Sequence, residues 1–388
     1  MTTLPTPSAV DKIHSQKLAL VIQKNIESSG GWISFEKFMQ LALYASSLGY
    51  YAAGSQKFGH FKNGGGDFVT APQISPLFAH TISKQIAQVL LLTQGSVLEL
   101  GAGTGKLAAD ILLKLADLDA LPIRYLILEV SDHLRQVQIE TMSEFLPKEI
   151  LDLVEWINVL PTSFCGVIFG NELLDAIPVS IVHKKADGIY ERGVVVSGEM
   201  FDWQDKLLIE SSLLDVTTQL SLPDDYITEV GLAASGLIAT LANIFQKGVI
   251  LMIDYGFSEL EYYHPQRNQG TLMCHYQHYA HSDPIINVGL QDITAHVNFT
   301  SIAHAGVNHG LELSGFCSQA QFLINCGILE EILQVSPNDI TSYAPLAAAA
   351  QKLLSPAEMG DLFKVIAFSK NIDESLIGFV SGDKSYSL

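Results

Sequence analysis

Apolar positions along the chain follow two spacings in turn, and this alternation predicts an α/β fold. Apolar runs predict buried strands, and helical spacing predicts helices between them. The expected strands are 97–100, 124–130, 154–159, 165–170 and 247–256, and the first expected helices between them are 106–118 and 132–145. Strands alternating with helices indicate a mostly parallel sheet with right-handed crossovers. We therefore expect a Rossmann-like core.

The same pattern divides the chain into four expected parts. Residues 1–92 read as an N-terminal helical cap with a glycine-rich lid loop, and 93–256 as the core with a β-hairpin insertion at about 179–230. Residues 257–345, poor in helical period at their start, read as an inserted substrate lobe. Residues 346–388 read as a C-terminal helix and closing strands.

Local signals refine these parts. Ser34 is expected to cap a helix in the cap region, and Ser75, followed by a proline, to cap a helix that runs to about Leu92. Apolar runs at 363–368 and 376–380 predict an antiparallel hairpin that closes the sheet.

The chain's clearest chemical signal is the glycine turn after the strand 97–100. Gly101, Gly103 and Gly105 alternate with small residues before a helical pattern begins. Backbone without Cβ atoms lets a ligand lie on the chain, and the start of a helix offers unpaired N–H groups. The turn therefore predicts a nucleotide-type cofactor site.

The spacing of these glycines separates three cofactor classes. A P-loop is excluded, because Leu107 follows Gly105-Lys106 and no glycine stands five places before Gly105. A dinucleotide fingerprint fits loosely over Gly103 to Ala108 and stays open. The G-x-G-x-G form, with Glu99 just before it, is the pattern of class I S-adenosylmethionine-dependent methyltransferases.

Polar residues at the ends of the following strands agree with a cofactor site. Glu129 ends the strand 124–130 and is expected to grip ribose hydroxyls, in either of the two surviving classes. Asn171 and Glu172 end the next strand, and Asp254 ends a later one. Ligands of parallel sheets bind at these carboxyl ends, so the residues are expected to converge.

Composition narrows the partners and the compartment. The 388 residues carry a formal net charge of −19 and are 48% hydrophobic. Nucleic acids bind mainly through neutralised phosphates, so no nucleic-acid partner is expected, whereas a basic protein would be attracted. The four cysteines are scattered and are expected to be reduced thiols. No secretion or import signal and no membrane insertion are expected, because the apolar stretch 231–245 is too short to cross a bilayer; a cytoplasmic location is expected.

Several motifs resemble one family in order along the chain. These are Tyr44–Tyr51 (Y-A-S-S-L-G-Y-Y), 66–70 (G-D-F-V-T), 98–105, 170–178 (G-N-E-L-L-D-A-I-P), 253–256 (I-D-Y-G), 292–299 (D-I-T-A-H-V-N-F) and 359–364 (M-G-D-L-F-K). The chain is similar to the MidA family, which includes the mitochondrial assembly-factor methyltransferase of respiratory complex I. The resemblance implies a class I methyltransferase core, S-adenosylmethionine as donor, and a protein arginine as the acceptor in the mitochondrial member.

Three positions depart from the family's pattern. Gln73 stands where family members usually carry Glu, Ala102 where the glycine turn often has Pro, and Asn298 where the family has Asp. Two carboxylates are thus missing from the expected acceptor side, which weakens the arginine inference more than the donor inference.

The reaction suggests roles for the remaining polar residues. Methyl transfer to a guanidinium needs carboxylates that orient the group and accept its proton, since guanidinium stays protonated to about pH 12. Glu172 and Asp175, three apart, would share a face if a helix turn begins there; otherwise Glu172 binds donor or backbone and Asp175 caps the turn. His296 is expected to orient an acceptor carboxylate, or to be structural.

The donor site is expected to include Gly101, Gly103, Gly105, Glu129 and Asn171. Asp67 and Thr70, with Phe68 between them, are expected to close over the donor. No metal is expected, because methyl transfer needs none and the histidine spacings match no common ligand set.

The sequence thus predicts a methyltransferase. The resemblance implies a protein arginine as its acceptor, in one interpretation an arginine of a respiratory complex I subunit. A small-molecule methyltransferase on the same fold remains open, as does a non-catalytic assembly factor that retains the donor site; a dehydrogenase is a more distant alternative. Homodimers formed through the cap are a further expectation.

Overall fold

The computed structural model describes residues 4–53 and 74–388, and the chain divides into two compact units. Each unit is assembled from separated segments of the sequence. Unit 1 comprises Met1–Phe68, Asp175–Gly236 and Glu259–Asn298, and unit 2 comprises Val69–Leu174, Leu237–Ser258 and Phe299–Leu388.

Unit 2 contains the mostly parallel sheet that the sequence predicts. Its strands are β2 (Ser96–Leu100), β3 (Tyr125–Leu128), β4 (Val154–Ile157), β5 (Phe164–Asn171), β10 (Phe245–Phe257), β15 (Glu312–Ser318) and β16 (Phe363–Lys370). The order is β15-β16-β10-β5-β2-β3-β4. Strands β10, β5, β2, β3 and β4 are parallel, and β16 runs antiparallel to both β10 and β15.

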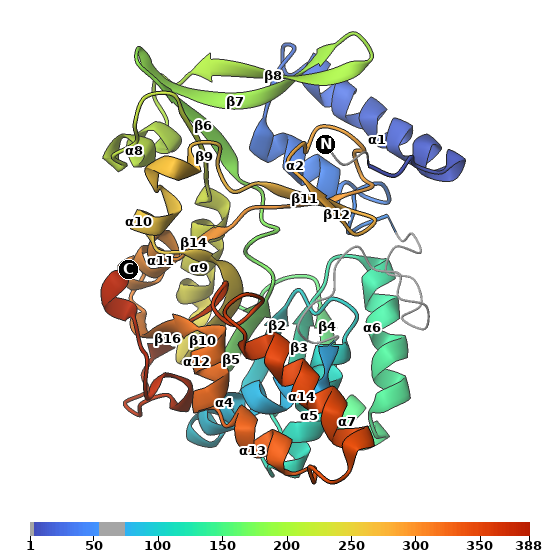
Figure 1. Cartoon of the computed structure of the whole chain (residues 1–388), viewed down its shortest axis with the longest axis vertical. Helices are drawn as coiled ribbons and strands as arrows, with labels where there is room; N and C mark the ends of the chain where they lie inside the picture. The colour runs from blue at the N-terminus through green and yellow to red at the C-terminus, as the bar shows by residue number, and fades with distance from the viewer. Residues whose placement is uncertain (1–3, 54–73) are drawn as a thin grey trace. The chain divides into compact units, whose positions relative to one another are not determined.

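Helices of unit 2 cover this sheet. They are α4 (Pro76–Thr93), α5 (Lys106–Asp117), α6 (Asp132–Phe145), α7 (Lys148–Leu151), α11 (Phe299–Asn308), α12 (Gln319–Asn325), α13 (Ile328–Leu333) and α14 (Ile340–Leu354), with 3₁₀ turns η4 (Ile377–Phe379) and η5 (Ser385–Ser387). Helix α9 (Leu232–Ile244) leads into β10. Figure 1 shows α4 and α5 beside β2 and β5, and their apolar side chains form one buried core with those strands. As expected, Ser75 caps α4, its hydroxyl accepting from the Leu77 N–H.

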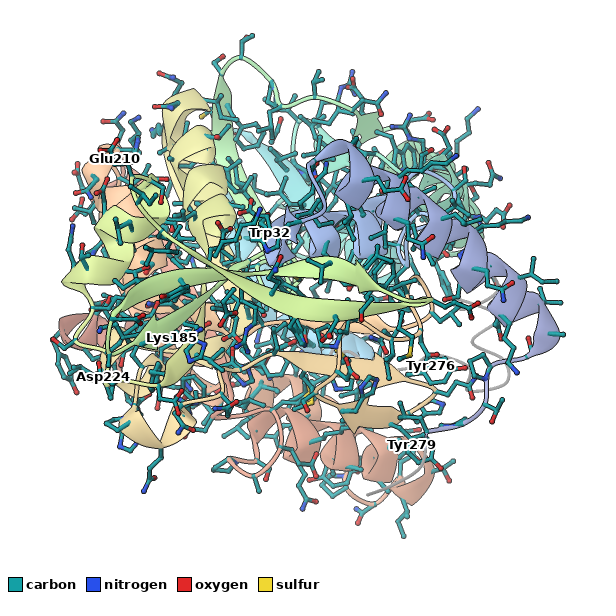
Figure 2. The ribbon with its side chains drawn as sticks, turned by 90° about the horizontal axis from the view of Figure 1, so that it is seen from above. Trp32, Lys185, Glu210, Asp224, Tyr276 and Tyr279 are labelled. Atoms are coloured by element: carbon teal, nitrogen blue, oxygen red, sulfur yellow. The ribbon has the colours of Figure 1, made fainter. Side chains whose placement is uncertain are left out.

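Unit 1 combines helices with two antiparallel sheets. Its elements are α1 (Ala9–Ser28), β1 (Ile33–Ser34), α2 (Phe35–Tyr44), β6 (Ser180–Lys185), β7 (Gly188–Ser197), β8 (Met200–Leu207), α8 (Ser212–Gln219), β9 (Tyr226–Val230), α10 (Glu259–Tyr262), η3 (Pro265–Arg267), β11 (Met273–Tyr276), β12 (Tyr279–His281), β13 (Asp292–Thr294) and β14 (Val297–Asn298). One sheet has the order β1-β7-β6-β9 with β8 on β7, and the other has the order β12-β11-β13. Figure 2 views the larger sheet from above, with Trp32 and Lys185 labelled.

The core of unit 1 is aromatic. Phe35 and Phe38 on α2 contact Trp203 and Phe201 on β8, with ring centroids 5.4 and 5.7 Å apart. Ser34 caps α2 as expected, because its hydroxyl accepts from the Lys37 N–H. These contacts tie the N-terminal helices to strands about 160 residues further along the chain.

The expected part boundaries need correction. The region expected as a separate cap, 1–92, is divided, because α4 packs on the central sheet while α1 and α2 join the hairpin strands of 179–230. The pairing of β1 with β7 makes that hairpin part of unit 1 and not an insertion on the core. The expected lobe 257–345 is also divided, since β15 pairs with β16 and the helices from α11 onward belong to unit 2.

The expected strand at 376–380 is wrong. The segment is the 3₁₀ turn η4, and its N–H groups bond to side chains of α4 instead of a strand. The Ile377 N–H donates to Gln88 Oε1 at 3.1 Å and the Gly378 N–H to Gln85 Oε1 at 2.9 Å. Strand β16 pairs instead with β10 and β15.

Within the described ranges, 4–53 and 74–388, no helix is both long and apolar enough to cross a membrane.

Candidate functional site

The turn between β2 and α5 exposes bare main chain. Gly101, Gly103 and Gly105 all have left-handed backbone conformations, with φ of +71°, +54° and +82°. Gly105 is the residue that caps α5, and it has no side chain to bond the first N–H groups of the helix. An uncapped helix start with a positive dipole end is suited to an electron-rich ligand.

The three glycines have different surroundings. A Cβ atom at Gly103 would meet no atom within 4 Å, so this peptide faces open space. A Cβ at Gly101 would lie 3.1 Å from Leu173 Cδ1, and one at Gly105 would lie 3.2 Å from Gln138 Cα. The backbone at Gly103 is therefore accessible, whereas Gly101 and Gly105 permit close packing of the turn.

Glu129 lies just past the end of β3, beside this turn. The residue is 7% exposed. Its carboxylate Oε1 accepts from the Ser131 N–H at 2.8 Å, and Oε2 accepts from Gln138 Nε2 at 3.0 Å. Burial raises the pKa of Glu129, and the hydrogen bonds from Ser131 and Gln138 oppose that rise. The carboxylate is thus held in a fixed orientation and keeps acceptor capacity for hydroxyl groups.

Gln138 joins Glu129 to the glycine turn and was not expected from the sequence. Its Nε2 also donates to the Gly103 carbonyl at 3.0 Å, and its Oε1 accepts from Trp156 Nε1 at 2.9 Å. The signal was present in the chain, since Leu134, Gln138 and Met142 recur at four-residue spacing on the buried side of α6. A polar residue in such an apolar stripe must find buried hydrogen-bond partners.

Glu99 does not face the turn's open side. It is 1% exposed, and its carboxyl accepts from the Tyr125 hydroxyl at 2.8 Å. Burial raises the pKa of Glu99 to about 8, while the Tyr125 hydrogen bond lowers it. The carboxyl group is therefore mostly protonated at neutral pH, and its hydrogen bond lies inside the sheet.

Asn171 is the last residue of β5, the strand next to β2, and Glu172 follows it. Glu172 has φ of +51°, a left-handed conformation rare for a residue with a side chain. Asn171 Nδ2 donates to Glu172 Oε1 at 3.1 Å. Asn171 Oδ1 is buried, and among the described residues it has no hydrogen-bond partner, which suits an N–H donor from a ligand.

Of the two alternatives for Glu172 and Asp175, the structure does not have the helix turn. No helix begins there, because Glu172 is left-handed and the following residues form an irregular turn. The two carboxylates therefore do not share a helix face.

Asp175 and His296 belong to unit 1. Asp175 is buried, and its backbone carbonyl accepts from the Ala295 N–H at 3.0 Å, so the two motifs that contain these residues meet. The His296 N–H donates to Thr271 Oγ1 at 3.1 Å. Nearby on the same motif, Asp292 Oδ1 accepts from the Tyr51 hydroxyl at 2.8 Å.

Two residues of this region were not anticipated. Glu229 is 1% exposed and accepts hydrogen bonds from the N–H and hydroxyl of Thr271, so it fixes the residue that holds His296. Tyr51 lies in the Tyr44–Tyr51 motif, but the motif alone did not indicate its hydrogen bond to Asp292. Asp67 and Thr70, expected to close over the donor, lie outside the described residues, as do Phe68 and Gln73.

No three His, Cys, Asp or Glu side chains gather as a metal site anywhere in 4–53 or 74–388. The bare turn at Gly103, the held carboxylate of Glu129 and the buried acceptor atom of Asn171 instead fit an adenosyl ligand that has ribose hydroxyls and an amino group.

Comparisons with known proteins agree with this geometry. A family model of S-adenosyl-L-methionine-dependent methyltransferases matches residues 81–317. The crystal structure of a Burkholderia thailandensis protein bound to S-adenosyl-homocysteine is 45% identical, covers 100% of both chains and superposes with a TM-score of 0.95. A native crystal structure from the same organism is 44% identical over 100% of both chains, with a TM-score of 0.93.

The chain is also similar to more distant mitochondrial proteins. The mitochondrial protein arginine methyltransferase NDUFAF7 of Danio rerio is 27% identical over 372 residues, which cover 86% of this chain and 82% of the relative. The homolog from Caenorhabditis elegans is 27% identical over 337 residues, 79% of this chain and 76% of the relative.

Fold, glycine turn and matches together define a class I S-adenosylmethionine-dependent methyltransferase. The expectation of this fold class and of S-adenosylmethionine as the donor is confirmed. The chain belongs to the matched methyltransferase family, the MidA family that its motifs resemble.

Proposed function

We propose that the protein transfers the methyl group of S-adenosylmethionine to an arginine side chain of a protein. The observation that carries the proposal is the position of Glu172. Its carboxylate follows β5, the strand that neighbours β2 and its glycine turn. The names of relatives at 26–27% identity support the choice of arginine.

On the donor side, the main chain at Gly101 and Gly103 would lie along the donor and Glu129 would accept hydrogen bonds from its ribose hydroxyls. Asn171 Oδ1 would accept from its amino group, because this buried atom otherwise lacks a partner among the described residues. Asp67 and Thr70 would close over it. The bound donor supplies a methyl group activated on a sulfonium.

On the acceptor side, Glu172 would orient the guanidinium and accept the proton that its nitrogen releases. As the new N–C bond forms, the S–C bond of the donor breaks and the sulfonium becomes a neutral thioether. Asp175 would support the acceptor, and His296 would orient it. Positioning of the two reactants is worth about 7–11 kcal/mol in favourable cases.

The test is transfer of label from methyl-labelled S-adenosylmethionine to proteins in a lysate, followed by acid hydrolysis of the labelled protein. The proposal expects methylarginine, which Glu172→Gln suppresses at least about tenfold. Label in another amino acid, or in a small molecule alone, would overturn the arginine assignment. A partner that binds but gains no label would favour the non-catalytic assembly factor.

The resemblance to the MidA family also proposes a subunit of respiratory complex I as the acceptor. Sequencing of the labelled protein tests this choice separately from the arginine chemistry.

A further inference from the structure

The chain leaves β5 through an unusual turn in unit 2. The last regular contact of the strand is the Glu172 N–H, which donates to the Ile253 carbonyl of β10 at 2.9 Å. The next two N–H groups, of Leu173 and Leu174, therefore need acceptors outside the ladder, because buried N–H groups are almost always paired.

Asp254 supplies that acceptor. Its Oδ2 accepts from the Leu173 N–H at 3.1 Å and from the Leu174 N–H at 2.8 Å. Its Oδ1 accepts from the Tyr255 N–H at 2.8 Å, which fixes the carboxylate on its own strand. The side chain thus bridges the ends of β10 and β5.

The bridge determines where two side chains lie. Glu172 is held left-handed between the Ile253 carbonyl and the two N–H groups that Asp254 binds. The Leu173 side chain is directed onto two glycines: a Cβ at Gly101 would lie 3.1 Å from its Cδ1, and one at Gly170 would lie 3.0 Å from its Cδ2. The turn is therefore seated against the donor-side glycine turn.

Asp254 itself cannot touch a substrate in this structure, because it is 0% exposed. A group so placed can affect the reaction only through the residues it holds. A left-handed residue with a side chain persists only where its surroundings fix it, and such conformations concentrate at functional sites.

We propose that Asp254 is a positioning residue for methyl transfer, which orients Glu172 by clamping the backbone of Leu173 and Leu174. The inference rests on the proposed function of Glu172.

The first test is hydrogen exchange, which needs no acceptor. In the wild-type protein the amides of Leu173 and Leu174 should exchange slowly. In Asp254→Ala, which has no side-chain acceptor, they should exchange at least about tenfold faster. Unchanged exchange at both amides would overturn the clamp.

The second test is kinetic. Asp254→Asn should lower kcat about 10–100-fold, because small misplacements of reacting groups have effects of this size, while the Kd for S-adenosyl-homocysteine changes less than about threefold. In the Glu172→Gln background the same substitution should change kcat less than about threefold, because residues that act as a unit are not additive. Additive losses would overturn the proposal.

Controls separate the possible failures. Asp383→Asn also removes a carboxylate that binds two N–H groups of unit 2, those of Phe316 and Ser385, and should leave kcat unchanged. If Asp254→Asn does not fold, Asp254→Glu keeps the charge one methylene away and should still lower kcat. Full activity in Glu172→Gln would refute the proposed function, whereas full activity in Asp254→Asn alone would refute this inference.

Discussion

Gln138 offers the sharpest test of the proposed donor site, because its side chain links Glu129, the Gly103 carbonyl and Trp156. We expect Gln138→Leu to weaken both donor binding and folding. Leucine nearly preserves the volume but removes the hydrogen bonds to Glu129, to the Gly103 carbonyl and from Trp156.

The magnitude follows from the partners. A bond to a charged group contributes about 1.5–3 kcal/mol and a neutral one about 0.5–1.5 kcal/mol. The side chain is fully buried, so the abandoned partners have no access to water there. Since such contributions add incompletely, we expect a loss of about 3 kcal/mol in the free energy of unfolding.

Donor affinity should fall about tenfold, which corresponds to about 1.4 kcal/mol, because Glu129 and the Gly103 carbonyl lose the side chain that binds both of them. The pKa of Glu129 should also rise, since the Gln138 hydrogen bond lowers it. A protonated carboxyl grips hydroxyl groups less well, so the decline of affinity with falling pH should begin at a higher pH in the variant.

Calorimetric titration with S-adenosyl-homocysteine between pH 5 and 8 measures both effects, and thermal unfolding measures the stability. Gln136→Leu is the matched control, because Gln136 lies on the same helix, is exposed and donates to Glu140 Oε1 one turn further along its surface. A variant that unfolds at lower temperature but binds as tightly as wild type at every pH would refute the reasoning and leave Gln138 a purely structural residue.

Three further substitutions probe other features. Gly103→Val should remain folded, because the new side chain enters open space and the left-handed backbone costs it only about 1–2 kcal/mol. The variant should nevertheless bind the donor at least about 100-fold more weakly in calorimetry. Undiminished affinity would refute the proposed donor site. Glu99 keeps its proton in the folded state up to about pH 8, whereas the unfolded chain releases it near pH 4.5, so the stability of the fold decreases as pH rises between these values. In Glu99→Gln this decrease should be smaller in thermal melts. An unchanged dependence of melting temperature on pH would contradict the raised pKa of Glu99. Glu331→Gln should destabilise the fold by about 3–5 kcal/mol in denaturant titrations, since it leaves the buried Lys114 and the neighbouring Lys84 without their carboxylate; a change under about 1 kcal/mol would show that this ion cluster contributes little.

The sequence predicts the local structure around this candidate site well. The glycines at 101, 103 and 105 and the acid at 129 are set by short-range chemistry: a left-handed turn requires glycine, and a carboxylate follows a buried strand. The strands and helices around them lie within a few residues of their expected positions. Each of these features depends on neighbours in the chain.

The errors arise where distant residues decide. The sequence left open whether a helix turn begins at Glu172, because groups about 80 residues away, on β10, bind the backbone there. The segment 376–380 alternates like a strand, yet Gln85 and Gln88 bind its N–H groups. No local pattern encodes such long-range acceptors, and Gln138 became visible only as a polar interruption of an apolar stripe.

The seat of Leu173 between Gly101 and Gly170 has an evolutionary consequence. A leucine fits at position 173 only while positions 101 and 170 have no side chain. Homologues with Ala at 170 should therefore carry a smaller side chain at 173. Such a steric constraint would appear as covariation of these two positions across species. In an engineered Gly170→Ala variant, the added substitution Leu173→Val should restore part of the lost stability.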